Sequence, residues 1–385
     1  MAEYHLRVRT ALLALPALTA LAAAALLGCG GGGDVTPPPP RAVDVAVTAG
    51  RLERGATVAL RITSDGAEVA AGGYTLTANP ADGAQFTGGA ARLLRTGRVA
   101  LIAQVGAERD SVVLDVAAPP TVVFERVASG ERDIYRVSLD GGDLTRLSST
   151  GTDDRAPTAA GGRVVFVSYR DGNGELYAVP LAGGAETRLT TTAANEGDPA
   201  LRADGTRLAF TSDVASGVPK LYTAAPDATG AARATEGIGI AGAVEATPSW
   251  SPAGDRIAYM STAGGTAAVH RIVVETGSDS VASPANLTSV EPAWSPGGRY
   301  IAFTAEAEGG DSELFVVDLA TGQLTRLTTR AGIDAQPAWL ADGRLVYAAM
   351  VSGVMRLRWL DPASPADVHD IDTGAGAASN PSGVY

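Results

Sequence analysis

The sequence predicts an all-β protein with two parts, and three observations support this prediction. Residues 42–118 contain short segments in which apolar and polar residues alternate, as in half-buried strands. Residues 121–385 repeat one unit several times without a helical period. The 47 glycines and 22 prolines supply the turns that connect many short strands.

The charge balance and the cysteine usage disfavour several kinds of site. Thirty basic and 42 acidic residues give a net charge of −12, which repels the phosphates of nucleic acids and of anionic lipids. We therefore expect no nucleic-acid partner. With Cys29 as its single cysteine, the chain cannot form an internal disulfide and carries no cysteine-based zinc or redox motif.

The first 28 residues are expected to be an export signal. Arg7 and Arg9 form a charged head, and residues 11–27 are apolar apart from Thr19. A retained membrane helix stays open as an alternative, because this apolar run approaches the roughly 18 residues that a membrane span needs.

The motif Leu26-Leu27-Gly28-Cys29 resembles the lipobox of bacterial lipoproteins. The resemblance implies a lipoprotein signal peptide at 1–28, cleavage before Cys29 and a lipid on its sulfur. Several acyl chains hold a protein stably at a membrane, whereas one chain does so only marginally. Aspartate after the cysteine would favour the inner membrane, and Gly30 in this place favours the outer membrane. The Gly- and Pro-rich residues 29–41 are expected to be a tether. The alternative is that Cys29 is simply a small residue at the end of an ordinary signal peptide.

Residues 42–118 predict a small β-sandwich. Apolar residues fall at every second position in "TVALRITSD" (57–65) and "GRVALIAQV" (97–105), with turns rich in Gly and Asp between such segments. The end of this part, "GRVALIAQVGAERDSVVLDV", resembles the last two strands of bacterial immunoglobulin-like domains. This resemblance implies a spacer or adhesive module.

Residues 119–385 contain variants of one unit. They include "ATPSWSPAGDRIAYMS" (246–261), "VEPAWSPGGRYIAFTA" (290–305) and "AQPAWLADGRLVYAAM" (335–350), with two more divergent copies upstream. The prolines of the five copies, at 157, 199, 248, 292 and 337, are 42, 49, 44 and 45 residues apart. A period near 45 residues without a helical pattern is typical of a four-stranded β-propeller blade.

The repeated proline marks the innermost strand of each blade. Proline lacks an N–H group and is therefore tolerated at a sheet edge, such as the strand that lines a propeller channel. The unit at 121–149 lacks this strand, and residues 377–385, which contain Pro381, can supply it. We therefore predict six blades within 119–385, closed by pairing of the last residues with 121–127, because closure removes an open sheet edge.

The units resemble the TolB-type propeller repeat, in which an Asp-Ala-x-x-Pro-x-Trp-Ser-Pro-Asp-Gly segment precedes an Ile-Ala-Phe strand. The resemblance implies a TolB-like, WD40-like propeller. Repeats of this type occur in periplasmic scaffolds, in accessory domains of peptidases and in polysaccharide-active proteins. The second and third units depart from the pattern, since Ala159 and Leu201 replace the tryptophan.

Catalytic signals are few. His270 and His369 lie in predicted strands without a partner motif, so we expect structural roles for both. Asp171, Asn173 and Glu175 have a spacing that could bind calcium through oxygen atoms, but a hairpin turn requires the same residue types. We expect the hairpin turn and no catalytic site, and calcium is the one candidate cofactor.

The strongest candidate site is a set of acidic residues just before the innermost strands. They stand three residues before the repeated prolines or immediately before them: Asp154, Glu196, Asp198, Glu245, Glu291 and Asp334. In a closed propeller these positions would ring one mouth of the channel, where converging charges would attract a cation or a basic peptide segment. The alternative is that they are solvated loop residues of an acidic protein.

Together these patterns predict a membrane-anchored envelope lipoprotein, periplasmic or surface-exposed, whose propeller is a non-catalytic protein-binding or scaffold module. The expected partner is an envelope protein or peptide. The alternative is a carbohydrate-binding or polysaccharide-active, lyase-like protein with a glycan as partner. Propeller lyases of related repeat type use histidine-rich metal centres, and the three histidines of this chain disfavour that alternative.

Overall fold

The computed structural model describes residues 43–149, 151, 153–236, 242–307 and 310–385. The expected signal peptide, Cys29 and the tether lie outside these residues. The described part of the chain consists of strands β1 to β32 joined by turns and loops, so the all-β prediction is confirmed. It contains no helix of the length and apolarity that crossing a bilayer requires.

The first eight strands form two antiparallel sheets. One sheet has the order β1-β2-β6-β5, with β3 beside β2, and the other has the order β4-β7-β8. The strands are β1 (Val43–Ala49), β2 (Thr57–Ser64), β3 (Ala67–Glu68), β4 (Thr75–Asn79), β5 (Ala84–Thr87), β6 (Ala90–Leu93), β7 (Gly97–Val105) and β8 (Glu108–Val116). Alternation along the strands creates their common core, in which Val58 and Leu93 of the first sheet meet Val99, Leu101 and Leu114 of the second. We call this part the sandwich.

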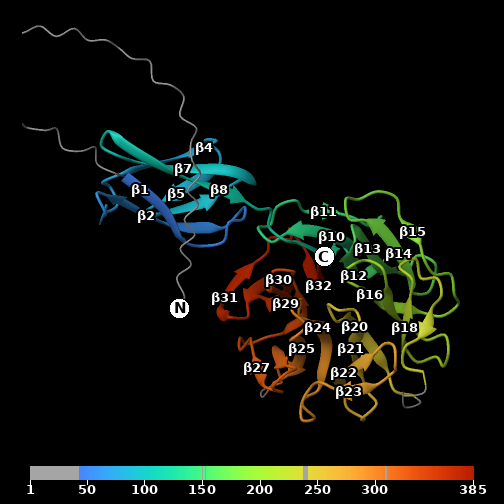
Figure 1. Ribbon diagram of the computed structural model, residues 1–385. Coiled ribbons are helices and arrows are strands. Elements are labelled where there is room, and N and C mark those ends of the chain that lie inside the picture. The colour runs from blue at the N-terminus through green and yellow to red at the C-terminus, as the bar shows by residue number, and fades with distance from the viewer. Residues whose placement is uncertain (1–42, 150, 152, 237–241, 308–309) are drawn as a thin grey trace, which may run out of the picture.

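The remaining strands form six four-stranded antiparallel sheets around a common centre (Figure 1). We number these sheets 1 to 6 along the chain and call them the ring. In sheets 2 to 6 the strands follow one another from the centre outwards.

The strands of sheets 2 to 4 are β12 (Asp154–Ala160), β13 (Arg163–Ser168), β14 (Glu175–Pro180), β15 (Thr187–Arg188), β16 (Glu196–Leu201), β17 (Leu208–Ser212), β18 (Lys220–Ala224), β19 (Ala232–Arg233), β20 (Glu245–Trp250), β21 (Arg256–Ser261), β22 (Ala268–Val273) and β23 (Asp279–Val281). Those of sheets 5 and 6 are β24 (Ser289–Trp294), β25 (Tyr300–Glu306), β26 (Ser312–Asp318), β27 (Leu324–Arg326), β28 (Asp334–Trp339), β29 (Leu345–Val351), β30 (Val354–Asp361) and β31 (Ser364–Asp370).

Sheet 1 takes its innermost strand from the other end of the chain. Strand β32 (Ala377–Gly383) pairs antiparallel with β9 (Thr121–Ala128), and β10 (Glu131–Ser138) and β11 (Thr145–Arg146) complete the sheet. Ala377 lies opposite Val127 and Gly383 lies opposite Val122. The predicted pairing of the last residues with 121–127 is therefore confirmed.

Buried apolar side chains of the ring lie between neighbouring sheets. Each of its six hydrophobic clusters combines residues of two consecutive sheets. Because both faces of such a sheet are covered, its strands can be apolar at nearly every position, as in "RVVFVS" of β13. In the seam between sheets 6 and 1, Ala378 of β32 packs with Val122, Phe124, Leu340 and Val346.

Every innermost strand contains a bulge at its repeated proline, where the register with the next strand shifts. We call the residue before each of these prolines the bulge residue. Its φ angle lies between 42° and 57° in all six strands, although none of the six is glycine: Ala156, Asp198, Thr247, Glu291, Gln336 and Asn380. Side chains of L-residues rarely adopt this conformation. A bulge redirects the side chain of the extra residue and tolerates a proline.

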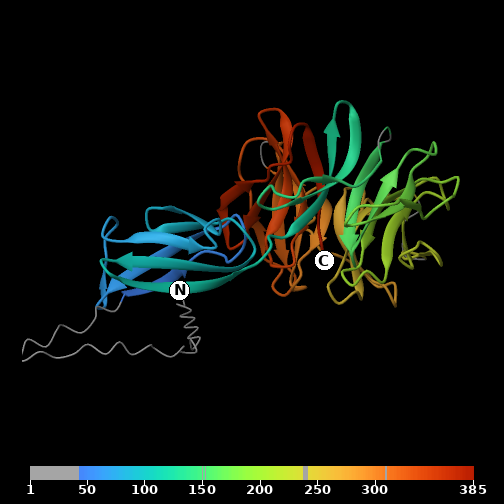
Figure 2. The ribbon, with the colours of Figure 1, turned by 90° about the horizontal axis from the view of Figure 1, so that it is seen from above.

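The sandwich lies beside the ring, next to sheets 1 and 6 (Figures 1 and 2). Its contacts come from residues 51–55 and reach the turn between β10 and β11, the turn between β28 and β29, and Asp361 at the end of β30, which accepts from Arg51 at 3.0 Å. These contacts lie on the face of the ring where the innermost strands end. The innermost strands begin at the opposite face.

Candidate functional site

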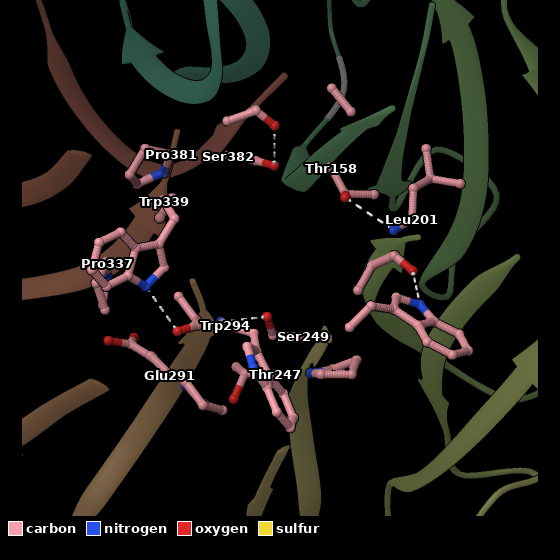
Figure 3. A pocket seen from close by; sticks show the side chains of 18 of the residues that line it. Thr158, Leu201, Thr247, Ser249, Glu291, Trp294, Pro337, Trp339, Pro381 and Ser382 are labelled. Carbon is pink, nitrogen blue, oxygen red and sulfur yellow. Dashed lines mark hydrogen bonds between the residues drawn. The ribbon is translucent and has the colours of Figure 1, made fainter. Parts of the chain in front are cut away.

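The centre of the ring holds a cavity of about 230 Å³ that all six innermost strands line. Its wall includes the six bulge residues and the prolines that follow them. Figure 3 shows Thr247, Glu291, Pro337 and Pro381 around the open space of this cavity. We call it the channel.

Side-chain oxygens of three bulge residues accept hydrogen bonds from the backbone N–H of the bulge residue in the next sheet. The backbone N–H of Thr247 donates to Asp198 Oδ2 (3.2 Å), and that of Asn380 donates to Gln336 Oε1 (2.8 Å). Glu291 Oε2 accepts from the N–H of Gln336 (2.9 Å) and from the Thr304 hydroxyl (2.8 Å). The two carboxylates therefore link neighbouring innermost strands while they line the channel.

Three bulge positions do not follow this pattern. Ala156 has no polar side chain, the buried Oγ1 of Thr247 has no hydrogen-bond partner, and the Asn380 side chain does not accept from the N–H of Ala156. The N–H of Ala156 instead donates to Glu125 Oε2 of β9, at 3.1 Å. From sheet 3 to sheet 5 the channel is thus lined by the carboxyl groups of Asp198 and Glu291, with Thr247 between them.

Burial makes both channel carboxylates costly to ionise. It raises the pKa of Asp198, and hydrogen bonds from Thr247 and Thr211 oppose this effect only in part. Burial also raises the pKa of Glu291, and the negative charge of Asp198 raises it further. A positive group in the channel would offset both effects, because it favours the ionised form of each carboxyl group.

Only Asp198 and Glu291 of the six predicted acidic residues line the channel. The expectation of a rim that includes the other four is wrong, because all four are buried: Asp154, Glu196, Glu245 and Asp334. The sheets stand radially around the centre, so side chains of a regular strand point into the seams between sheets. The bulge alone turns a side chain into the channel.

Each of these four buried residues begins an innermost strand and contacts polar groups beside the seam. Arg170 contacts Asp154 at 3.3 Å, and Arg330 contacts Asp334 at 3.3 Å. Lys220 Nζ lies 3.6 Å from Glu245 Oε1. These carboxyl groups are therefore structural and are not available to a partner at the channel mouth.

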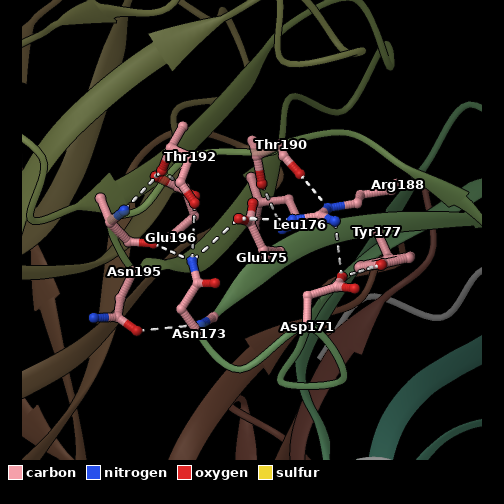
Figure 4. A network of polar contacts seen from close by, with 12 residues as sticks. Asp171, Asn173, Glu175, Leu176, Tyr177, Arg188, Thr190, Thr192, Asn195 and Glu196 are labelled. Atoms are coloured by element: carbon pink, nitrogen blue, oxygen red, sulfur yellow. Dashed lines mark hydrogen bonds and ion pairs between the residues drawn. The ribbon is translucent and has the colours of Figure 1, made fainter.

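The residues considered for calcium form a hydrogen-bonded turn (Figure 4). Asn173 Nδ2 donates to Glu175 Oε1 (3.1 Å), and the Arg188 guanidinium lies 3.3 Å from Asp171 and 3.1 Å from Glu175. Amide and guanidinium N–H groups thus contact the carboxylate oxygens that a calcium ion would need. Within the described ranges, no group of three or more His, Cys, Asp or Glu side chains is arranged to hold a metal ion.

A buried acid pair lies next to this turn, in the seam between sheets 2 and 3 (Figure 4). Glu196 accepts hydrogen bonds from the hydroxyls of Thr192 and Ser212, both at 2.9 Å. Oε2 of Glu175 has no hydrogen-bond partner. Burial raises the pKa of Glu196, and the neighbouring Glu175 charge adds to this rise. A proton retained on Glu196 can therefore be donated to Glu175.

Of the histidines in the described ranges, His270 lies in the third strand of sheet 4 and His369 in the outermost strand of sheet 6. His270 Nδ1 is 2.7 Å from Asp279 Oδ2, and its ring packs against Tyr259 with centroids 5.6 Å apart. The His369 ring stacks on Trp359 with centroids 4.0 Å apart. Neither residue lines the channel.

The Glu175–Glu196 pair predicts that stability falls as the pH rises. The folded state keeps the Glu196 proton at pH values where the unfolded chain has lost it, since the folded pKa exceeds the ordinary value of 4.5. This contribution is complete below pH 4.5 and is lost as the pH rises through the raised pKa. Glu196→Gln, which mimics the protonated acid, should show a smaller loss between pH 5 and pH 8.

The measurement is the free energy of unfolding in urea at several pH values between these limits. Glu236→Gln replaces an exposed residue and serves as the matched control, with the same pH dependence as the unmodified protein. An equally steep decline in Glu196→Gln would show that this residue does not retain its proton.

Comparisons with known proteins support one fold for the ring. Residues 238–355 match the family described as TolB beta propeller domain. TolB from Acinetobacter baumannii superposes with a TM-score of 0.63 at 16% identity, covering 81% of this chain and 83% of that chain. The putative TolB from Agrobacterium tumefaciens gives 0.54 at 18% identity, covering 65% of this chain and 88% of that chain.

Hydrazine synthase from Kuenenia stuttgartiensis also superposes, with a TM-score of 0.56 at 12% identity, over 69% of this chain and 47% of that chain. No curated protein matches the sequence. At such identities the superpositions establish the fold and not the role. Together with the sequence match, they show that the ring is a TolB-like β-propeller.

Proposed function

We propose that the protein is a lipid-anchored component of the bacterial cell envelope that binds another envelope protein without catalysing a reaction. In this proposal Cys29 carries the lipid, residues 42–118 form an immunoglobulin-like spacer, and residues 119–385 form a six-bladed propeller that holds the partner. The observation that carries the proposal is the channel half with Asp198 and Glu291.

The channel favours a cationic group of the partner. A lysine or arginine side chain supplies a positive charge, which would stabilise the ionised forms of Asp198 and Glu291 that burial disfavours. It also supplies several N–H donors, which the carboxylate oxygens of Asp198 and Glu291 can accept. We therefore propose a basic peptide segment as the part of the partner that enters the channel.

We propose that the partner enters from the face opposite the sandwich contacts, because Asp198 and Glu291 lie at that end of the channel, whereas Ala203, Pro252 and Pro296 line its other end. The bulge residues lie near the beginning of the innermost strands, and the loops on this face carry Tyr169 and Val214, which are 41% and 60% exposed. The Arg155 guanidinium stands 5.2 Å from the centre of the Tyr169 ring, beside bulge residue Ala156. Aromatic and arginine side chains of this kind are enriched in protein interfaces.

The tryptophans beside the channel do not favour a glycan ligand. Trp250, Trp294 and Trp339 are buried. Their indole N–H groups donate to backbone carbonyls at 3.0 to 3.1 Å. Exposed aromatic faces on which a sugar could stack would be needed for the carbohydrate-binding alternative, and these three rings do not provide them.

Neutralising the channel tests the proposed binding. We expect the double variant Asp198→Asn, Glu291→Gln to recover at least tenfold less of the partner from envelope extracts, because the charges that attract the basic segment are gone. Asp204→Asn, Glu275→Gln removes the same charge from exposed positions outside the channel and should recover the partner fully. The measurement is quantitative mass spectrometry of cross-linked, affinity-purified complexes. Equal recovery by both double variants would contradict the role of the channel.

Replacing the proposed lipid attachment site tests the anchor. We expect Cys29→Ser to move the protein from the detergent phase to the aqueous phase in Triton X-114 partitioning and to abolish labelling with radioactive palmitate. The reason is that serine offers no thiol for the lipid. Thr36→Ser, in the same tether, should stay in the detergent phase. Detergent partitioning of Cys29→Ser with its first 28 residues still attached would instead support a retained membrane helix.

A further inference from the structure

A buried arginine joins the sandwich to sheet 6. Arg344, in the turn between β28 and β29, is 0% exposed. Its guanidinium donates to both carboxylate oxygens of Glu53 in the sandwich, at 2.6 and 2.8 Å, and to Asp342, at 2.6 and 2.8 Å. It also stands 4.9 Å from the centre of the Trp359 ring. Bidentate pairing in a buried place gives this contact a defined geometry.

The next residue of the sandwich reaches sheet 1. Arg54 Nε donates to Asp140 Oδ2 (2.8 Å), and its Nη2 donates to Asp143 Oδ2 (2.6 Å), both in the turn between β10 and β11. Gly55 lies so close to this turn that a Cβ atom there would be 2.5 Å from Asp140 Cβ. The close approach, together with a φ of +87°, requires glycine at this position.

Glu53 and Arg54 thus bridge sheets 6 and 1, which the chain itself joins only where β31 leads into the closing strand β32. Sheets 2 to 6 follow one another along the chain, whereas β9, β10 and β11 come from the other end of the propeller part and meet sheet 6 through β32, the apolar seam around Ala378 and the segment that leads from β31 into β32. The contacts of Glu53 and Arg54 cross this seam without involving β32. These contacts therefore connect sheets 6 and 1 at a second place, apart from the pairing of β32 with β9.

We propose that residues 51–55 are a clasp that keeps the ring closed, so that release of the sandwich loosens the pairing of β32 with β9. The clasp adds to the closure in two ways. It holds the β10–β11 turn at a fixed distance from sheet 6, and it limits the separation of β9 from β32. The orientation of the sandwich and the closure of the channel are then coupled.

Hydrogen exchange of the backbone amides in the full chain tests the clasp. We expect Glu53→Gln, which weakens the contact with sheet 6, to speed exchange in 121–128 and 377–383 at least tenfold. Arg54→Gln, which removes the contact with sheet 1, should do the same. Both variants should leave exchange in β20 and β21 unchanged, because these strands lie in sheet 4.

Asp82→Asn is the matched control, since it removes an exposed carboxylate that pairs with Arg95 within the sandwich (3.1 Å). It should leave the exchange of the closing strands unchanged. Unchanged exchange of these strands in both clasp variants, or equal acceleration in Asp82→Asn, would overturn the proposal. If Glu53→Gln does not fold, Arg54→Gln decides alone, because it leaves the buried Arg344–Glu53 pair intact.

Discussion

The antiparallel pairing of β32 with β9 is the interaction on which the rest of the ring depends. It places Ala378 in the seam between sheets 6 and 1 and removes the open edge of β9. Hydrogen bonds near the channel also connect the closing strand β32 to its two neighbours, β28 and β9. Asn380 donates to Gln336, and the Ser379 hydroxyl donates to Glu125, at 2.8 and 2.9 Å. A common channel exists because the chain end completes the first sheet.

The closed ring can hold six backbone positions that single strands disfavour. A non-glycine residue with positive φ costs about 1–2 kcal/mol, and the described innermost strands contain one at every bulge. Strain of this kind persists where surrounding structure enforces it, and it is concentrated at functional sites. Here it directs the Asp198 and Glu291 carboxylates into the channel, where burial raises the pKa of both. Backbone geometry and electrostatics therefore indicate the same site.

The sequence predicted the sheets better than the site. Proline is restricted to sheet edges and bulges, so its 45-residue period located the innermost strands and identified residues near Pro381 as the closing strand. The side-chain directions could not be predicted, since residue types as different as alanine and glutamate occupy the bulge. For this reason Glu196 was expected at the rim but lies in a seam. The Arg344–Glu53 contact joins positions 291 residues apart and leaves no local pattern.

Photo-cross-linking in living cells tests most directly whether the channel-mouth face binds a protein partner. A photoreactive phenylalanine analogue would replace Tyr169 or Val214 on this face, and Val281 in outer strand β23 as a control; all three are exposed. The account predicts that one partner cross-links from the first two positions and not from Val281. It also predicts that Asp198→Asn, Glu291→Gln abolishes these adducts. Equal adducts from all three positions, adducts that survive neutralisation of the channel, or no adduct at all would contradict it.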